Sequence, residues 1–189
     1  MGFKRLFFDI ETSYCEGWFW NPAFNTTITY DQVFKESKII CICYKFQGSN
    51  KVHHLTWDKG DDLKMMEKFF KVIEESDEII AHNGDRFDLK WIRTRFLMAG
   101  FVGMPEIKSI DTLKISRSKF KFPSNRLDAI GKYLGVGRKV DTGGIDLWHG
   151  VIQFNSKKSM AKMVEYCKGD VELLERVFLK LEGFSKPKT

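Results

Sequence analysis

Acidic residues stand in three separated segments of this 189-residue chain, each beside an apolar stretch. Asp9 and Glu11 follow the apolar run LFF, Asp88 follows EIIAHNGDRF, and Asp170 lies within the C-terminal segment YCKGDVELL. A carboxylate next to a hydrophobic core is costly unless a cation or hydrogen bonds compensate its charge. Three such placements in one small chain therefore indicate a shared cation site, and oxygen ligands favour Mg²⁺ or Mn²⁺.

The spacing of these residues predicts that they converge. Asp9 and Glu11 are two positions apart on a predicted strand, so both side chains leave the same face of a sheet. Tyr166 and Asp170 are four positions apart on a predicted helix, where they share one face. Asp88 begins another predicted helix directly after a strand. Two strands and two helices would thus direct four carboxylates and one phenol to one place.

The hydrophobic pattern predicts an α/β fold in which a central mixed sheet is flanked by helices. Strands are predicted over residues 4–10, 38–46, 51–57, 78–83 and 106–112, and helices over 61–76, 88–100, 124–134 and 156–181. The polar turn QGSN between the second and third strands predicts a hairpin. With 43% hydrophobic residues, the chain suits a single domain over 1–189, whose last residues, 185–189, we expect to fray.

Composition points away from a membrane. No apolar run approaches the roughly 20 residues that a spanning helix needs. The N-terminus does not match a signal peptide, because Asp9 and Glu11 interrupt what would be its apolar core. The four cysteines form no CxxC pair and are expected to be reduced, buried thiols in a cytoplasmic protein: Cys15, Cys41, Cys43 and Cys167.

Positive charge is concentrated in one segment. Residues 108–139 carry nine basic and two acidic residues, a net charge of +7, whereas the whole chain carries +6. This predicts a polyanionic partner, with nucleic acid as the first candidate. Four cations near Phe120 and Phe122 are the candidates for contact with a single strand, although a solvated charged surface is an equal alternative: Arg117, Lys119, Lys121 and Arg126.

Aromatic residues crowd the segment 14–36, directly after the first acidic pair. They include Tyr14, Trp18, Phe19, Trp20, Phe24 and Tyr30. Such rings either stack on unpaired bases or pack a long loop onto the sheet. We favour packing, since a loop of this length usually needs its own small core.

The combined motifs resemble one family. The DEDDy branch of the DnaQ-like 3′–5′ exonucleases carries a DxE strand, an Nx₃(F/Y)D segment and a Yx₃D helix. These motifs are matched here by Asp9 and Glu11, by Asn83, Phe87 and Asp88, and by Tyr166 and Asp170. The sister branch carries His five residues before the final Asp, where this chain has Glu165. Segments 110–112, 125–135 and 146–148 further resemble small stand-alone phage and bacterial relatives of the family-B DNA polymerase exonuclease domain.

The resemblance implies a ribonuclease H-like fold, in which three antiparallel strands are extended by parallel ones. It also implies hydrolysis of the 3′-terminal phosphodiester with two divalent cations, Mg²⁺ or Mn²⁺. Asp9, Glu11 and Asp170 would hold one cation, Asp9 would bridge to the second, and Asp88 would support the second largely through water. Tyr166 would orient or help deprotonate the attacking water.

The same resemblance implies substrate contacts at Ile10, Thr12, Asn83 and Phe87. For Asn83 a second role is equally open, since Asn is also a common turn residue that could cap the turn before the helix. The expected substrate is a single-stranded or frayed 3′ end, with DNA favoured over RNA, in the cytoplasm of a bacterial or phage-infected cell. An exoribonuclease of the same fold and a catalytically silent nucleic-acid-binding module are the alternatives. Replication or repair proteins as partners cannot be read from the sequence.

Overall fold

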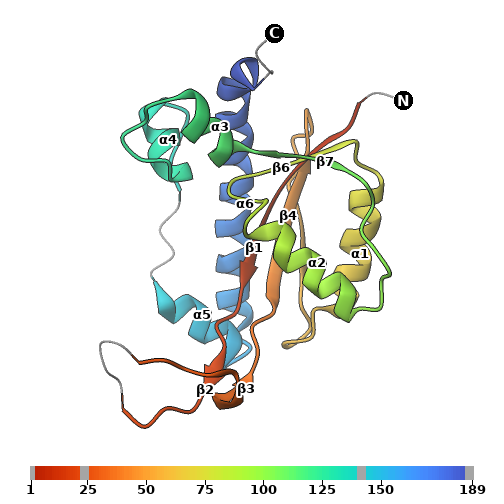
Figure 1. Cartoon of the computed structure of the whole chain (residues 1–189), viewed down its shortest axis with the longest axis vertical. Coiled ribbons are helices and arrows are strands. Elements are labelled where there is room, and N and C mark those ends of the chain that lie inside the picture. Colours follow the sequence, from red (N-terminus) through yellow and green to blue (C-terminus); the bar gives the residue numbers. More distant parts are fainter. Residues whose placement is uncertain (1–2, 22–25, 140–143, 186–189) are drawn as a thin grey trace.

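The computed structural model describes residues 3–21, 26–139 and 144–185. A five-stranded sheet forms the middle layer, with the long helix α6 along one face and α1 and α2 on the other (Figure 1). The strands are β1 (Arg5–Thr12), β2 (Glu16–Gly17), β3 (Val33–Lys35), β4 (Ile39–Phe46), β5 (His53–Thr56), β6 (Glu78–Ala81) and β7 (Lys108–Asp111). The α-helices are α1 (Leu63–Glu74), α2 (Asp88–Met98), α3 (Thr112–Lys119), α4 (Leu127–Tyr133), α5 (Ile145–Ile152) and α6 (Lys157–Leu181). Two 3₁₀ turns, η1 (Tyr30–Gln32) and η2 (Glu182–Phe184), complete the described elements.

The sheet has the strand order β5-β4-β1-β6-β7. β1 pairs antiparallel with β4 and β4 with β5, whereas β1 pairs parallel with β6 and β6 with β7. This confirms the predicted mixed sheet, in which three antiparallel strands are extended by parallel ones. β1 therefore lies at the centre, with strands on both sides.

Alternation along β1 separates two cores. Leu6, Phe8 and Ile10 are buried in the core beneath α1 and α2, whereas Phe7 is buried on the side of α6. Because successive side chains of a strand point to opposite faces, Asp9 belongs to the same side as Phe7. The first acidic pair is thus directed at α6.

Helix α6 begins and ends close to its predicted bounds. The Ser156 hydroxyl accepts a hydrogen bond from the Ser159 backbone N–H at 3.2 Å, which caps the first turn. Its buried stripe includes Met163, Cys167 and Phe178. This long apolar face holds the helix against the sheet.

Asp61 and Asp62 stand at the start of α1 and make different contacts. Asp62 occupies the cap position, but its carboxylate accepts hydrogen bonds from Arg95 at 2.6 and 2.8 Å and from the Ile39 N–H at 3.1 Å. Asp61 instead accepts the Leu63 N–H at 3.1 Å. Both acids are used, one for the helix end and one for a buried ion pair.

Two helices were not predicted. No helix was predicted between the strand over 106–112 and the helix over 124–134, but residues 112–119 form α3, which Asp111 caps by accepting the Leu113 N–H at 2.9 Å. The exposed cations of α3 masked its short buried face. Helix α5 was missed because eight residues give too little periodicity.

The packing favoured for the aromatics of residues 14–36 is wrong for most of them. Trp20 is 98% exposed, and Trp18, Phe19 and Tyr30 are exposed as well. These residues belong to an arm built around β2 and β3 that extends beyond the sheet (Figure 1). Among the described aromatics predicted there, Tyr14 is the one that packs against the main core, and Phe24 lies outside the described residues.

Two smaller predictions have mixed outcomes. Cys41, Cys43 and Cys167 are buried free thiols, but Cys15 is exposed, because it lies on the arm and not against the sheet. Of the tail expected to fray, Ser185 is hydrogen-bonded to the Glu182 carbonyl, and 186–189 lie outside the described residues. Within the described chain, no helix combines the length and apolarity needed to cross a membrane.

Candidate active site

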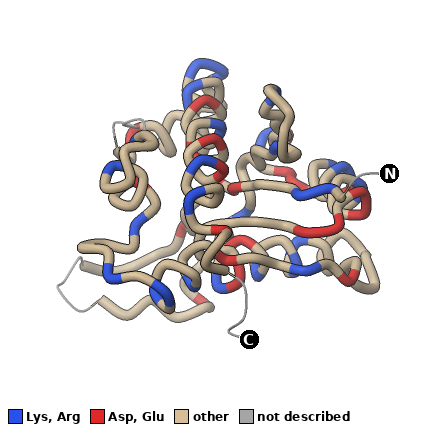
Figure 2. Tube along the Cα trace, turned by 90° about the horizontal axis from the view of Figure 1, so that it is seen from above, with Lys and Arg blue, Asp and Glu red and all other residues tan. Residues whose placement is uncertain are grey.

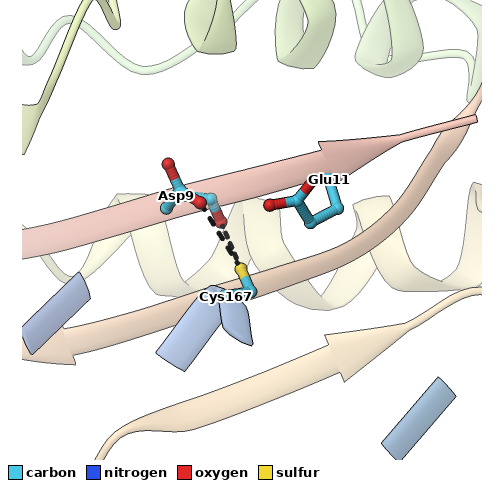
Figure 3. Close-up of side chains that lie close together, drawn as sticks. All are labelled: Asp9, Glu11 and Cys167. Atoms are coloured by element: carbon cyan, nitrogen blue, oxygen red, sulfur yellow. Dashed lines mark hydrogen bonds between the residues drawn. The ribbon is translucent and has the colours of Figure 1, made fainter. Parts of the chain in front are cut away.

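The first acidic pair meets helix α6 at one cysteine. Asp9 and Glu11 project from β1 toward Cys167 of α6, and one ligand atom from each of the three residues lies within 4.8 Å of the others (Figure 3). The Cys167 thiol donates to the Asp9 backbone carbonyl at 3.4 Å and contacts Asp9 Oδ2 at 3.7 Å. The structure thus places the DxE pair on one face, as its spacing predicts.

Burial and mutual repulsion raise the pKa of both carboxyl groups. The pKa of Asp9 is raised well above its ordinary value, first by burial and then by the charges of Asp88, Glu11 and Asp170. Burial and the Asp170 charge raise the pKa of Glu11 to about 8, while Lys139 opposes them. Carboxyl groups in such surroundings become carboxylates when a cation binds next to them.

Asp88 and Asp170 complete the acidic site from two helices. Asp88 begins α2 and is 3% exposed, and Asp170 lies in α6 and is 1% exposed. Burial raises the pKa of Asp88 to about 7, and burial also raises the pKa of Asp170. In each residue Oδ1 is buried without a hydrogen-bond partner among the described residues. A bound cation would give these two orphaned carboxylate oxygens the partner that buried polar atoms usually have.

Other buried carboxylates of the described chain have partners of their own. Glu78 pairs with Arg5 and Lys108, each at 2.7 Å, and Asp62 forms a bidentate pair with Arg95. The four acidic residues of the site instead share one described ammonium, that of Lys139. Their donor set of carboxylate oxygens fits Mg²⁺ or Mn²⁺.

Lys139 is the main residue that the sequence prediction missed. Its ammonium forms an ion pair with Asp170 Oδ2 and lies 3.3 Å from the Tyr166 hydroxyl and 5.3 Å from the centre of that ring. Although burial lowers its pKa, the Asp170 charge outweighs this and raises it, so the side chain stays a cation. Its backbone N–H donates to Asp128 of α4 at 2.7 Å. The contacts of Lys139 with Asp128 and Asp170, which come from distant parts of the chain, distinguish it from the other cations of the basic segment.

Tyr166 lies one helical turn before Asp170 and beside Lys139. Burial, followed by the Asp170 charge, raises the pKa of the phenol to about 12. The hydroxyl therefore keeps its proton near neutral pH and can donate a hydrogen bond. This favours orienting a water over deprotonating it.

A cavity of about 900 Å³ adjoins the acidic site at Lys139. Its lining brings together three residues predicted to bind substrate, Asn83, Arg117 and Arg126, with Arg138 and Lys139, which were not predicted. Lys119 and Lys121, also predicted, are exposed and do not line it. Figure 2 shows basic and acidic residues along the whole trace. The lining of the cavity has four basic residues, Arg117, Arg126, Arg138 and Lys139, and one acidic residue, Asp128.

One wall of this cavity is fixed by His82. Burial lowers the pKa of His82, so the ring is neutral near pH 7. Nε2 contacts the Asn125 carbonyl at 2.9 Å, where it must donate, and Nδ1 contacts the Thr112 hydroxyl at 2.8 Å. His82 thus joins the end of β6 to α3 and to the loop before α4.

Four further residues were predicted to contact substrate, and their side chains and backbones differ in accessibility: Ile10, Thr12, Asn83 and Phe87. The Ile10 side chain is buried in the core beneath α1 and α2, so only its backbone could contact substrate. The Thr12 carbonyl accepts the Trp148 indole N–H at 3.0 Å. Phe87 is exposed, and Asn83 has a φ of +65°, with its carbonyl accepting the Phe87 N–H at 3.0 Å. Asn83 therefore forms the turn before α2 and also lines the cavity, so both roles raised for it stay compatible.

Comparison with known proteins identifies the family. A model of the RNase H superfamily matches residues 6–182, and the chain belongs to this superfamily. The chain is 36% identical over 103 residues to a DNA polymerase of Pyrococcus glycovorans, covering 49% of this chain and 11% of the polymerase. It is 32% identical over 108 residues to a DNA polymerase of Desulfurococcus sp. (strain Tok), covering 51% of this chain and 12% of that protein. The matched half of this chain thus covers about a tenth of the length of these relatives.

A solved structure shows the same fold. The family B DNA polymerase from the hyperthermophilic archaeon Pyrobaculum calidifontis superposes with a TM-score of 0.73 at 17% sequence identity. The match covers 97% of this chain and 25% of the polymerase chain. The predicted ribonuclease H-like fold is confirmed.

Proposed function

We propose that this chain is a metal-dependent exonuclease that removes nucleotides from the 3′ ends of single-stranded or frayed nucleic acid, with DNA as the preferred substrate. The observation that carries the proposal is the cluster of four carboxylates, two buried and two half-buried, that share one described ammonium and keep two unpaired oxygens. Membership of the RNase H superfamily and similarity to DNA polymerases support it. The 3′–5′ direction is supported by the match to the three motifs of the tyrosine branch.

Asp9, Glu11, Asp88 and Asp170 would hold two Mg²⁺ or Mn²⁺ ions. When bound, the ions lower the pKa of the attacking water and neutralise charge on the leaving 3′ oxygen. Tyr166 keeps its proton and can donate a hydrogen bond that holds a water or a phosphate oxygen in place. Lys139 supplies a fixed positive charge next to Asp170.

The basic cavity gives the strand a place to bind. Arg117, Arg126 and Arg138 line it with Asn83, and Lys139 joins it to the carboxylates. Guanidinium groups suit phosphate oxygens because they offer paired donors. The cavity would therefore hold the phosphates upstream of the bond that is cut.

End-labelled oligonucleotides of DNA and of RNA, incubated with Mg²⁺ or Mn²⁺, test the proposal. A 3′–5′ exonuclease releases labelled mononucleotide at once from 3′-labelled substrate and gives a descending ladder from 5′-labelled substrate. Preference for the RNA oligonucleotide would favour the exoribonuclease. Binding without cleavage would favour the silent module, and cleavage that persists in excess EDTA would exclude the metal-dependent mechanism.

A matched pair of variants locates the chemistry. Asp88→Asn should remove nearly all cleavage, whereas Asp85→Asn should cleave like wild type. Asp85 lies in the same loop, but its carboxylate is engaged by Ser109 at 2.7 Å and Lys114 at 2.6 Å. Equal losses in both variants would mean that the loop, and not the Asp88 carboxylate, matters.

A further inference from the structure

The acidic site contains a sulfur ligand that Mg²⁺ and Mn²⁺ do not need. Cys167 is fully buried in α6, and its thiol faces Asp9 and Glu11 of β1 (Figure 3). Thiolate is a soft ligand that selects Zn²⁺, Cd²⁺ and related ions, whereas the carboxylates around it also suit hard ions. The thiol of Cys167 and the carboxylates of Asp9 and Glu11 therefore offer soft and hard ligand atoms at one place.

The distances suit a tetrahedral ion. Metal–sulfur and metal–oxygen bonds of about 2.3 and 2.1 Å at the tetrahedral angle place sulfur and oxygen ligands about 3.6 Å apart. The observed separation between Cys167 Sγ and Asp9 Oδ2 is 3.7 Å. The ligand atoms of Asp9, Glu11 and Cys167 all lie within 4.8 Å of one another, so small side-chain rotations would close the site.

A separate observation points to a cation at this place. Oδ1 of Asp170 is buried without a partner among the described residues, in a residue that is 1% exposed. The charge of Asp170 raises the pKa of both Asp9 and Glu11, so this carboxylate lies near the pair. It could supply a fourth ligand or hold a metal-bound water.

Two further thiols stand on the neighbouring strand. Cys41 and Cys43 of β4 lie opposite Glu11 and Asp9 in the sheet register. Burial raises the pKa of the Cys167 thiol, so the sulfur keeps its proton in the metal-free protein and releases it when a cation binds beside it.

We propose that Asp9, Glu11 and Cys167 form a binding site for one thiophilic divalent cation, Zn²⁺ or Cd²⁺, in which the Cys167 thiol releases its proton to solvent and ligates the ion as a thiolate. Because the ion uses two of the carboxylates assigned to Mg²⁺ or Mn²⁺, it competes with them. Inhibition of cleavage by Zn²⁺ rests on the proposed function, but binding of the ion does not.

Titration of the metal-free protein with Cd²⁺ tests the site without any nucleic acid. Wild type and Cys15→Ser should both develop the ultraviolet charge-transfer absorption of a cadmium thiolate at one equivalent, and Cys167→Ser should not. Cys15 is the matched control because its thiol is exposed. A signal that survives Cys167→Ser, or one that disappears in Cys15→Ser, would overturn the proposal.

Two further measurements separate this site from a purely sulfur-bound ion and from a folding defect. Asp9→Asn should weaken Cd²⁺ binding by at least about tenfold, since even changes behind the ligands cost that much. Unchanged affinity would mean that Asp9 is not a ligand. X-ray absorption of the Zn²⁺-loaded wild type should show one sulfur at about 2.3 Å together with oxygen neighbours. A shell without sulfur, or with sulfur alone, would refute the assignment, whereas a missing nuclease activity would leave it standing.

Discussion

In the metal-free protein, the acidic site should make the fold less stable as the pH rises. Burial and the charge of Asp170 raise the pKa of Glu11 from its ordinary 4.5 to about 8, and Asp88 and Cys43 add to this, while Lys139 opposes it. A raised carboxyl pKa means that the native state binds a proton that the unfolded chain has already released. The free energy of unfolding therefore falls as the pH rises from about 4.5 to 8, with the full loss above the folded-state pKa.

The size of this loss of stability follows from the pKa shift of Glu11. A change of 3.5 pKa units corresponds to about 5 kcal/mol for Glu11, taken as an upper bound because water entering the site relieves part of it. This is comparable with the total stability of a small domain. Between those pH values each retained proton contributes a slope of about −1.4 kcal/mol per pH unit.

Urea unfolding in EDTA at pH 5 and pH 8.5 measures the effect. Glu11→Gln removes the titrating group and should be more stable than wild type at pH 8.5 and have a shallower dependence on pH. Glu165→Gln is the matched control, since that side chain is 71% exposed and pairs with Lys168 on the helix surface. A wild type whose stability does not change between the two pH values, or a Glu165→Gln protein that behaves like Glu11→Gln, would refute the reasoning. Added Mn²⁺ should remove most of the dependence, because bound cations keep the carboxylates ionised.

Three further changes test individual side chains. Tyr166→Phe should keep the fold and metal binding but slow cleavage about 10- to 1000-fold, mostly in kcat, and a wild-type rate would make the phenol structural. The double variant Arg117→Gln with Arg126→Gln should weaken single-strand binding. It should also reduce the slope of log binding constant against log salt concentration by about 0.7 for each lost phosphate contact, which is more than Lys121→Gln alone should do. Equal slopes in the two proteins would show that the cavity does not hold the strand. Lys139→Met should lower the free energy of unfolding of the metal-free protein by about 3–5 kcal/mol, because it leaves the Asp170 carboxylate unpaired. In urea unfolding experiments, added Mn²⁺ should restore much of this loss. A metal-free variant as stable as wild type would mean that the ion pair does not stabilise the fold.

Much of the site was predictable because its geometry is local. The period of a strand fixes Asp9 and Glu11 on one face, and the period of a helix fixes Tyr166 above Asp170. The order of strands and helices then brings these segments together in the sheet and the helix that covers it. Hydrophobic periodicity carries this information, and it was strong in α6 and in the central strands.

The features that the sequence did not reveal depend on contacts between distant segments. Lys139 becomes the counter-ion of Asp170 only because Asp128 holds its backbone, and nothing in the run GVGRK marks it. The exposure of Trp20 follows from an arm whose two short strands pair with each other and leave the sheet. Burial of a loop residue depends on where the loop goes, which composition does not specify.

Charge balance links the acidic site with the basic cavity. Without cations, four ionised carboxylates and the Lys139 ammonium would leave the site with a net charge of −3. Burial raises the pKa of all four acids, and repulsion by the other acids of the site adds to this for Asp9 and Glu11. Two bound divalent cations would change this charge to +1, which matches the single negative charge of one phosphodiester. Above about pH 8, where Glu11 is ionised without metal, the metal-free site should therefore repel the strand that the metal-loaded site attracts. Under these conditions, binding to the cavity at Arg117 and Arg126 should depend on metal even in a variant that cannot cleave.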